Sequence, residues 1–211
     1  SGFGKDVPNE GVGKKPGVYT KWADCLKQVD GVNGAVYKAF PSYEMALEAF
    51  NSDYHKYIGK STPKKELSKE ELSLIGKPVF PSIAVDAACN SRTGRMEYQG
   101  VDAKTGKLLF HQGPFDEGTN NIGEFLAIVH GLAFLQKHNS SIPLYTDSVT
   151  AMKWVRIKRA NTEQERTEAN KQLFELVDRA EHWLKNNQWP NQILKWHTEA
   201  WGEIPADFGR K

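Results

Sequence analysis

The chain has 211 residues, of which 39% are hydrophobic and 26% are charged, a composition typical of a globular protein with one or two domains. Its apolar runs are far too short to cross a bilayer, which argues against a membrane protein. The formal net charge of +2 does not by itself indicate a nucleic-acid partner. Cys25 and Cys89 lack the spacing of a disulfide framework or a structural zinc site, so we expect a soluble protein of the cytoplasm.

The first sixty residues predict a small α+β module. A helix is expected at 22–29, a strand at 35–40 and a second helix after Pro41 and Ser42. The next segment is dense in Lys, Glu, Ser and Pro and poor in periodic apolar residues, which is typical of a linker. We therefore divide the chain into a module at 1–60, a linker at 61–80 and a larger domain at 81–211.

The larger domain predicts a mixed sheet with helices on its faces. Strands are expected at 82–88, in a hairpin at 96–115, and at 143–147 and 193–198, with helices at 124–138, 148–158 and 168–187. Strands that first pair antiparallel and then alternate with helices indicate an α/β fold.

Acidic residues fall at strand ends and helix starts of this domain. Asp86 lies inside an apolar strand, unless that strand ends early and Asp86 begins a turn. Glu124 at a helix start and Asp147 after a strand each have a simple alternative as helix caps. Asp207 and Glu203 lie at a last short helix, where a solvated terminal turn would explain both.

Together, Asp86, Glu124, Asp147 and Asp207 would form a cluster of like charges, and such a cluster needs bound cations. Hard divalent ions prefer oxygen ligands, and two of them about 4 Å apart can activate a water and stabilise the leaving oxygen of a phosphodiester. The pattern therefore predicts phosphoryl chemistry with two Mg²⁺ ions, or with Mn²⁺ in their place.

Several motifs resemble the type 1 ribonucleases H, in the bacterial forms that carry an N-terminal hybrid-binding domain. In chain order they are VDAACN, EYQGVDAKTG, GTNNIGEFLAIVHGL, YTDS, ILKWHT and WGEIPADFGRK. The resemblance implies a ribonuclease H-like fold, a mixed five-stranded sheet flanked by helices. It also implies an endonuclease that hydrolyses the RNA strand of RNA/DNA hybrids by two-metal-ion catalysis and leaves 5′-phosphate and 3′-hydroxyl ends.

The resemblance gives each acid a role. Asp86 would bridge both metals, and Glu124 and Asp147 would complete the site of the metal nearer the leaving group. Asp207 would hold the metal that activates water. Glu203 matches an accessory acid that assists metal exchange and product release.

The resemblance also extends to nucleic-acid contacts. Asn120 and Asn121 match positions that read the RNA minor groove and its 2′-hydroxyls, although a plain turn is the alternative. Thr119, Asn121, Thr162 and Thr198 match a pocket for a phosphate of the DNA strand.

Two positions depart from the family's pattern. The motif CNSRTGR stands where the family has a Gly-rich turn with Asn-Pro-Gly, so the RNA contact of that Asn falls to Asn90 or Arg92. Val149 stands where a Gln commonly touches a base edge, and valine has no hydrogen-bonding group in its side chain. We therefore expect one minor-groove contact to be missing.

The segment GVYTKWADCLKQVDGVNGAVYKAF resembles the hybrid-binding domain. Trp22 and Tyr37 would pack against sugars of the DNA strand and Lys38 would contact a phosphate. For Trp22 a place in the core of the module is the alternative. The family's first strand is here KDVPNEGVG, whose proline, glycines and acids disfavour a strand, so we expect weakened hybrid binding.

Two other functions are alternatives. A non-catalytic hybrid-binding protein would keep the module and the fold, and another nuclease of the superfamily, such as a transposase, integrase or resolvase, would share strand-end acids. The intact acid set argues against the first, and the GTNN and GEF motifs argue against the second. The expected partner is an RNA/DNA hybrid. The sequence indicates no membrane and no obligate protein partner, and we expect a monomer.

Overall fold

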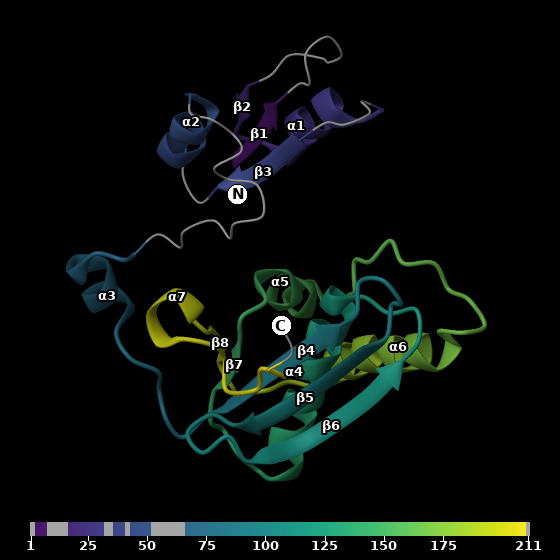
Figure 1. The fold of residues 1–211 in the computed structure, drawn as a ribbon. Coiled ribbons are helices and arrows are strands. Elements are labelled where there is room, and N and C mark those ends of the chain that lie inside the picture. Colours follow the sequence, from purple (N-terminus) through teal and green to yellow (C-terminus); the bar gives the residue numbers. More distant parts are fainter. Residues whose placement is uncertain (1–2, 8–16, 32–35, 41–42, 52–65, 210–211) are drawn as a thin grey trace. The chain divides into compact units, whose positions relative to one another are not determined.

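The computed structural model describes residues 3–7, 17–31, 36–40, 43–51 and 66–209 (Figure 1). The chain divides into two compact units, Ser1–Leu67 and Ser68–Lys211. The boundary lies within the segment 61–80 that the sequence predicts to be a linker, of which 61–65 fall outside the described part. Each unit contains its own sheet.

The N-terminal unit contains a three-stranded antiparallel sheet and two helices. Strand β1 (Phe3–Val7) lies between β2 (Val18–Tyr19) and β3 (Val36–Phe40). Helices α1 (Trp22–Val29) and α2 (Tyr43–Asn51) follow β2 and β3. The predicted helix at 22–29, the strand and the second helix are therefore confirmed.

The expectation that KDVPNEGVG disfavours a strand was wrong for its first residues. Lys5, Asp6 and Val7 belong to β1, which starts at Phe3 and ends before the proline. Strand β1 pairs with a neighbour on both sides, and these backbone hydrogen bonds outweigh the low strand propensity of its residues. The remainder of the motif, residues 8–13, lies outside the described part.

The C-terminal unit contains a mixed five-stranded sheet in the order β6-β5-β4-β7-β8. The strands β4 (Ile83–Cys89), β5 (Met96–Asp102) and β6 (Leu108–Phe115) pair antiparallel. The strands β7 (Leu144–Thr146) and β8 (Ile193–Lys195) continue the sheet in parallel with β4. This order confirms the predicted α/β fold.

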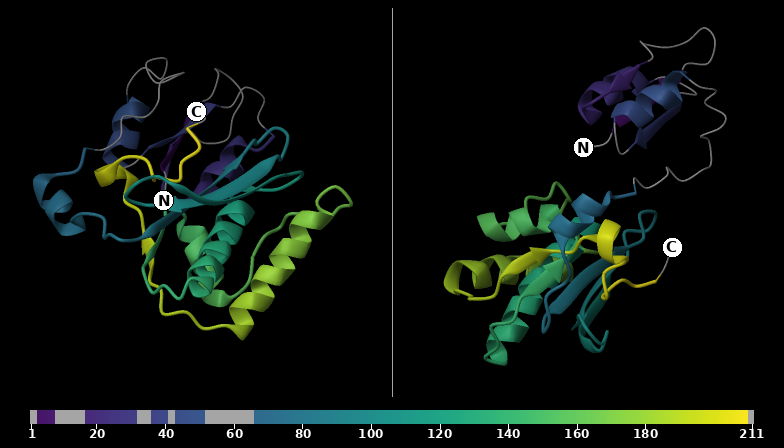
Figure 2. Two further views of the ribbon diagram at one scale, coloured as in Figure 1. Left: turned by 90° about the horizontal axis from the view of Figure 1, so that it is seen from below. Right: turned by 90° about the vertical axis from the view of Figure 1, so that its left-hand side faces the viewer.

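Helices α4 (Asn120–Lys137), α5 (Val149–Ile157) and α6 (Lys171–Asn186) lie on one face of this sheet, and the short α7 (Thr198–Trp201) lies on the other (Figure 2). Helix α4 packs against the central strands β4 and β5. Because β4 is covered on both faces, its sequence reads as a nearly continuous apolar run, which Asp86 alone interrupts. In the part of the chain that is described, no helix combines the length and apolarity that a bilayer crossing requires.

Part of the predicted linker folds onto the C-terminal unit. Helix α3 (Lys69–Ile75) begins with a capping box. After this helix, the carbonyl oxygen of Gly76 accepts a hydrogen bond from Trp201 Nε1 at 2.9 Å, and the Val79 N–H donates to the Tyr145 hydroxyl at 2.8 Å. Both aromatic partners belong to the apolar cluster under α7, so this part of the segment is anchored rather than a free tether.

Candidate active site

Asp86 lies in the middle of β4 and is only 7% exposed. The alternative that the strand ends early is wrong, because β4 continues to Cys89 and Asp86 pairs in register with Gln99 of β5. Successive side chains of a strand alternate between faces, so Asp86 shares its face with Ala84 and not with Val85.

Glu124 lies one turn inside α4 and does not cap it. The helix begins at Asn120, and its N-cap is Thr119, whose hydroxyl accepts a hydrogen bond from the Ile122 N–H at 3.2 Å. The capping alternative for Glu124 is therefore wrong. Its side chain is 2% exposed, and Oε1 accepts a hydrogen bond from the Ala87 N–H at 3.2 Å, whereas Oε2 has no partner among the described residues.

The sheet topology explains why Glu124 reaches the backbone of β4. The parallel ladder between β4 and β7 ends at Ala84 and Tyr145. Beyond that point the Ala87 N–H needs another acceptor, because a buried backbone donor without one is costly. The carboxylate of Glu124 fills this place and thereby comes close to Asp86.

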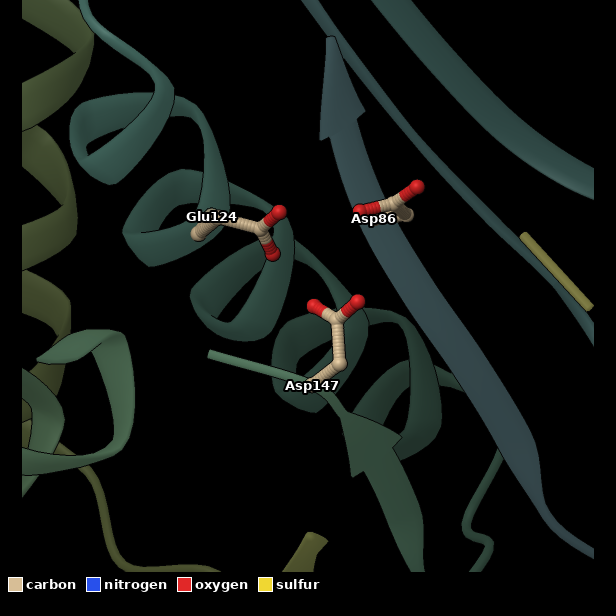
Figure 3. A group of neighbouring side chains, drawn as sticks. All are labelled: Asp86, Glu124 and Asp147. Atoms are coloured by element: carbon tan, nitrogen blue, oxygen red, sulfur yellow. The ribbon is translucent and has the colours of Figure 1, made fainter. Parts of the chain in front are cut away.

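Asp147 follows β7 directly and does not cap the next helix. The N-cap of α5 is Ser148, whose hydroxyl accepts from the Ala151 N–H at 3.1 Å, so the capping alternative is wrong here too. The carboxylates of Asp86, Glu124 and Asp147 point toward one another from three different elements (Figure 3). One oxygen of each lies within 4.8 Å of the others, which is an arrangement that can hold a metal ion.

Burial raises the pKa of all three carboxyl groups above the ordinary range, because each group loses hydration as an anion. The pKa of Asp86 is raised further by the charges of Asp147 and Asp207. The pKa of Glu124 is raised further by the adjacent Asp86. A bound divalent cation would relieve this repulsion by replacing the protons.

Asp207 and Glu203 lie close to this cluster but are not members of it. The charge of Asp207 raises the pKa of both Asp86 and Asp147, and the charge of Glu203 raises that of Asp147. Asp207 is half-buried and Glu203 is exposed. Glu203 is therefore exposed to solvent and close enough to Asp147 to affect its pKa.

The placement of Asp207 at a last short helix was wrong. That helix, α7, ends at Trp201, and Asp207 follows a turn in which its N–H donates to the Ile204 carbonyl at 2.9 Å. Its Oδ2 accepts a hydrogen bond from the Gly209 N–H at 3.0 Å, which orients the carboxylate locally.

Lys195 is a charged neighbour of the site that the sequence did not indicate. It ends β8 and pairs in register with Thr146, the residue before Asp147. Its charge acts to lower the pKa of Asp147 against the larger effect of burial, and its Nζ donates to the Trp196 carbonyl at 2.7 Å. The sequence shows a lysine at the end of the apolar run ILK. That this lysine lies near Asp147 follows only from the pairing of β7 with β8.

The polar residues predicted to contact nucleic acid gather in part around the start of α4. Asn120 and Asn121 are exposed in the first helical turn, so the plain-turn alternative is wrong. A pocket of about 510 Å³ is lined by Thr119, Asn120, Gln164 and the turn 90–94.

The other two predicted threonines do not line this pocket. Thr162 is half-buried in the loop between α5 and α6, where its hydroxyl accepts from the Gln164 N–H at 3.1 Å. Thr198 is half-buried and opens α7. Trp154 and Trp196 are 7% and 4% exposed and belong to the core.

The two departures from the family's pattern have definite places. The Oδ1 atom of Asn90 accepts hydrogen bonds from the N–H groups of Arg92 at 3.0 Å and Thr93 at 3.2 Å, and so closes the turn after β4. The Arg92 side chain is exposed. Val149 begins α5 and is 65% exposed.

In the N-terminal unit, Trp22 is the first residue of α1. Tyr37 and Lys38 are adjacent in β3 and pair in register with Asp6 and Lys5 of β1.

Comparisons with known protein families show where the chain belongs. Residues 81–206, more than half of the chain, match the RNase H family model. The chain belongs to the ribonuclease H family. Residues 11–50 match the Ribonuclease H1 N-terminal domain, the second part that the sequence motifs indicated.

Individual ribonucleases H resemble the chain over shorter stretches. A curated ribonuclease H of Saccharomyces cerevisiae is 31% identical over 87 residues, or 37% of this chain, and the chain spans 25% of that relative's length. The N-terminal RNase H domain of a Mycobacterium tuberculosis protein is 16% identical, with a TM-score of 0.35 over 55% of this chain and 86% of that one. LC11-RNase H1, from compost, solved in complex with an RNA/DNA hybrid, is 18% identical, with a TM-score of 0.36 over 55% and 83%.

Proposed function

We propose that this protein is an endonuclease that hydrolyses the RNA strand of RNA/DNA hybrids with two divalent cations and leaves 5′-phosphate and 3′-hydroxyl ends. The observation that carries the proposal is the convergence of three carboxylates, the buried Asp86 and Glu124 and the half-buried Asp147, in a chain of the ribonuclease H family. The match of residues 11–50 to the Ribonuclease H1 N-terminal domain supports the hybrid as substrate.

The residues of the site fit divalent cations. The buried Oε2 of Glu124 has no hydrogen-bond partner in the described part of the chain, and carboxylate oxygens are the ligands that Mg²⁺ prefers, with Mn²⁺ as an alternative. Asp86, Glu124 and Asp147 would hold one ion, and Asp86 and Asp207 the other. When bound, the ions supply charge stabilisation at the phosphate and lower the pKa of water.

The chain's own residues orient these groups. Burial around Asp86 and Glu124 holds both side chains in place and excludes bulk water from that side. Lys195 favours the ionised form of Asp147. Glu203 is exposed yet close enough to influence Asp147, which suits an accessory acid that assists product release.

The hydroxyls of Thr119 and Thr162 suit a phosphate of the DNA strand. Each accepts a hydrogen bond from a backbone N–H and therefore keeps its own proton to donate. A phosphate oxygen only accepts, so these hydroxyls position the strand without reading its sequence. Asn121 and Thr198 complete the proposed contact set.

On the RNA strand, the exposed amides of Asn120 and Asn121 can donate to and accept from 2′-hydroxyls, the groups that distinguish RNA from DNA. Two residues could replace the turn asparagine of the family. Arg92 is the better candidate, because the side-chain oxygen Oδ1 of Asn90 already accepts hydrogen bonds that close the turn. Val149 offers no hydrogen bond, so the corresponding minor-groove contact is absent from the proposal.

Cleavage of end-labelled substrates tests the proposal. With Mg²⁺ the protein should cut the RNA strand of a hybrid, spare its DNA strand, and leave duplex DNA and duplex RNA intact. Excess chelator should abolish cutting, and the products should accept a 5′ label only after phosphatase treatment. Equal cutting of both strands would indicate another nuclease of the superfamily, and hybrid binding without cutting would indicate a non-catalytic binder.

Removal of residues 1–67 should raise the KM for long hybrids by roughly tenfold, because the N-terminal unit increases the local concentration of the catalytic unit. The kcat should change little, since the unit contains none of the four acids. Steady-state kinetics on long and short hybrids measures this. The KM for short hybrids should be nearly unchanged by the truncation. An unchanged KM on long hybrids would contradict a binding role for the unit.

Within that unit, Trp22→Ala should weaken hybrid binding at every salt concentration, because it removes apolar contact. Lys38→Ala should also reduce the slope of log Kd against log salt by about 0.9, the amount expected for the loss of one phosphate contact. Lys27→Ala is a matched control, because Lys27 is an exposed lysine of α1 outside the proposed contacts. Equal slopes for both lysine variants would contradict the assignment of Lys38.

A further inference from the structure

Glu117 lies at a junction of three segments and has an unusual backbone. It precedes Gly118 and Thr119, the N-cap of α4, and its φ of 46° lies in the left-handed region. Residues with a Cβ adopt this region only when surrounding contacts hold them there. The contacts of Glu117 therefore show which segments hold this conformation.

The first set of contacts comes from the loop 158–170 between α5 and α6. The carbonyl oxygen of Glu117 accepts hydrogen bonds from Gln164 Nε2 at 2.9 Å and from Asn170 Nδ2 at 3.2 Å. The Thr167 hydroxyl donates to the Glu117 carboxylate. Asn170 is 1% exposed, so part of this junction is deeply buried.

The second set of contacts comes from the turn after β4. The Gly118 N–H donates to the Gly94 carbonyl at 2.7 Å. A Cβ added at Gly94 would lie 3.0 Å from the Glu117 Cα, and one added at Gly118 would lie 2.9 Å from the Met96 Cβ. A larger residue at Gly94 would meet the backbone of Glu117, and one at Gly118 would meet the Met96 side chain, so either substitution would force these neighbours to shift.

The loop has a separate anchor on α6. The Arg166 guanidinium makes two hydrogen bonds to the Asp178 carboxylate, at 2.9 and 2.6 Å, and lies 4.6 Å from the centre of the Phe174 ring. Arg166 fixes the middle of the loop to the helix, whereas Glu117 fixes it to the start of α4. Thr162 and Gln164 lie on the stretch of loop that precedes Arg166.

We propose that Glu117 is a positioning residue for substrate binding: it ties the loop 158–170 to the N-terminus of α4, so that Thr162 and Thr119 present their hydroxyls to the hybrid at a fixed separation. This inference rests on the proposed function. It predicts an effect on substrate affinity and not on the chemical step, because Glu117 is not among the acids that converge at the site.

Three variants of the full chain test the proposal. Glu117→Gly suits the left-handed backbone and keeps the carbonyl acceptor, but loses the carboxylate. Glu117→Gln keeps an acceptor oxygen for Thr167. Thr167→Val removes the hydroxyl at nearly constant volume, and with it both the bond to Glu117 and the acceptor of the Asn170 N–H at 3.3 Å.

We expect Glu117→Gly to raise the KM for hybrid roughly fivefold, as the loss of one hydrogen bond would, and Thr167→Val to raise it at least as much, with kcat within about twofold of wild type in both. The double variant should resemble Thr167→Val alone, because that substitution already removes the bond that Glu117→Gly removes. Amide hydrogen exchange in 158–170 should become faster in both. Glu117→Gln should restore wild-type KM and exchange.

Charge alone would act in the opposite direction, because removal of an anion near nucleic acid favours binding. Glu163→Gln, at an exposed acid of the same loop, measures that effect. An unchanged KM in Glu117→Gly, or equal losses of kcat in Glu117→Gly and Glu117→Gln, would overturn the proposal. If wild type binds hybrid without cutting it, the proposed function fails, and the Kd values of the same variants still decide the positioning role.

Discussion

Asp147→Asn is expected to lower kcat by at least roughly a thousandfold, a barrier increase of about 4 kcal/mol, while the protein still binds hybrid. Asparagine keeps the size of the side chain but removes one of three converging charges, so the affinity for divalent cations should fall. Single-turnover cleavage at saturating enzyme measures the chemical step, and fluorescence anisotropy of a labelled hybrid measures binding.

Asp102→Asn is the matched control for this substitution. Asp102 ends β5 and pairs with Ile83 at the start of β4, several residues along the ladder from Asp86. The same chemical change there should leave kcat near wild type. Activity of Asp147→Asn within about tenfold of wild type, or loss of hybrid binding in the same variant, would contradict the assignment of Asp147 to the metal site.

The second large effect concerns the metal-free protein, which should lose stability as pH rises. The folded-state pKa values of Asp86, Glu124 and Asp147 are raised, so above the ordinary carboxyl range the unfolded chain releases protons that the folded protein still holds. Unfolding then releases protons and is favoured by higher pH. The contribution of these groups to stability should be greatest near or below pH 4.5, the ordinary pKa of a glutamate such as Glu124. It should then fall as the pH rises through neutrality.

Glu124→Gln should therefore stabilise the metal-free protein by about 2 kcal/mol at pH 8, because glutamine is neutral and folding no longer requires a buried carboxyl group to take up a proton. For a unit of this size the midpoint of thermal unfolding should rise by roughly 2–4 °C per kcal/mol. The same variant should lose cleavage. Thermal melts from pH 5 to pH 9, each with Mg²⁺ and with chelator, measure both dependences.

With magnesium bound, wild type should become more stable than Glu124→Gln. The ion should stabilise wild type increasingly as pH rises, because binding replaces protons, and should have a much smaller effect on Glu124→Gln. A wild-type melting temperature that rises with pH in chelator, or one that does not respond to Mg²⁺ at pH 8, would show that these acids are not poised for a cation.

The local sequence was sufficient to place Asp86 and Asp147, because each stands in or directly after an apolar strand. The sequence predicts that a helix starts at Glu124, whereas the helix begins at Asn120, because the polar GTNN run hides its first turn. The correct position matters, because only the second turn of α4 lets this carboxylate reach the Ala87 N–H. The order of the motifs therefore predicted which acids form the candidate site. The reason why Glu124 is buried became clear only from the sheet, where it meets the Ala87 N–H.

Lys195 and Glu117 could not be recognised from neighbours in the sequence. Lys195 is close to Asp147 only because β8 pairs in parallel with β7. Glu117 gains its role from Gln164, Thr167 and Asn170, about fifty residues later in the chain. Both depend on contacts that exist only after folding.

The anchoring of residues 76–79 limits how this protein can be recombined with others. A chimera joined at Pro81 would leave Trp201 Nε1 without its acceptor and the Tyr145 hydroxyl without its donor. Trp201 directly precedes the stretch that leads to Glu203 and Asp207, so such a graft would disturb support for the acids. A junction ahead of Ser68 keeps both hydrogen bonds, and natural or engineered exchange of the N-terminal module should respect that position.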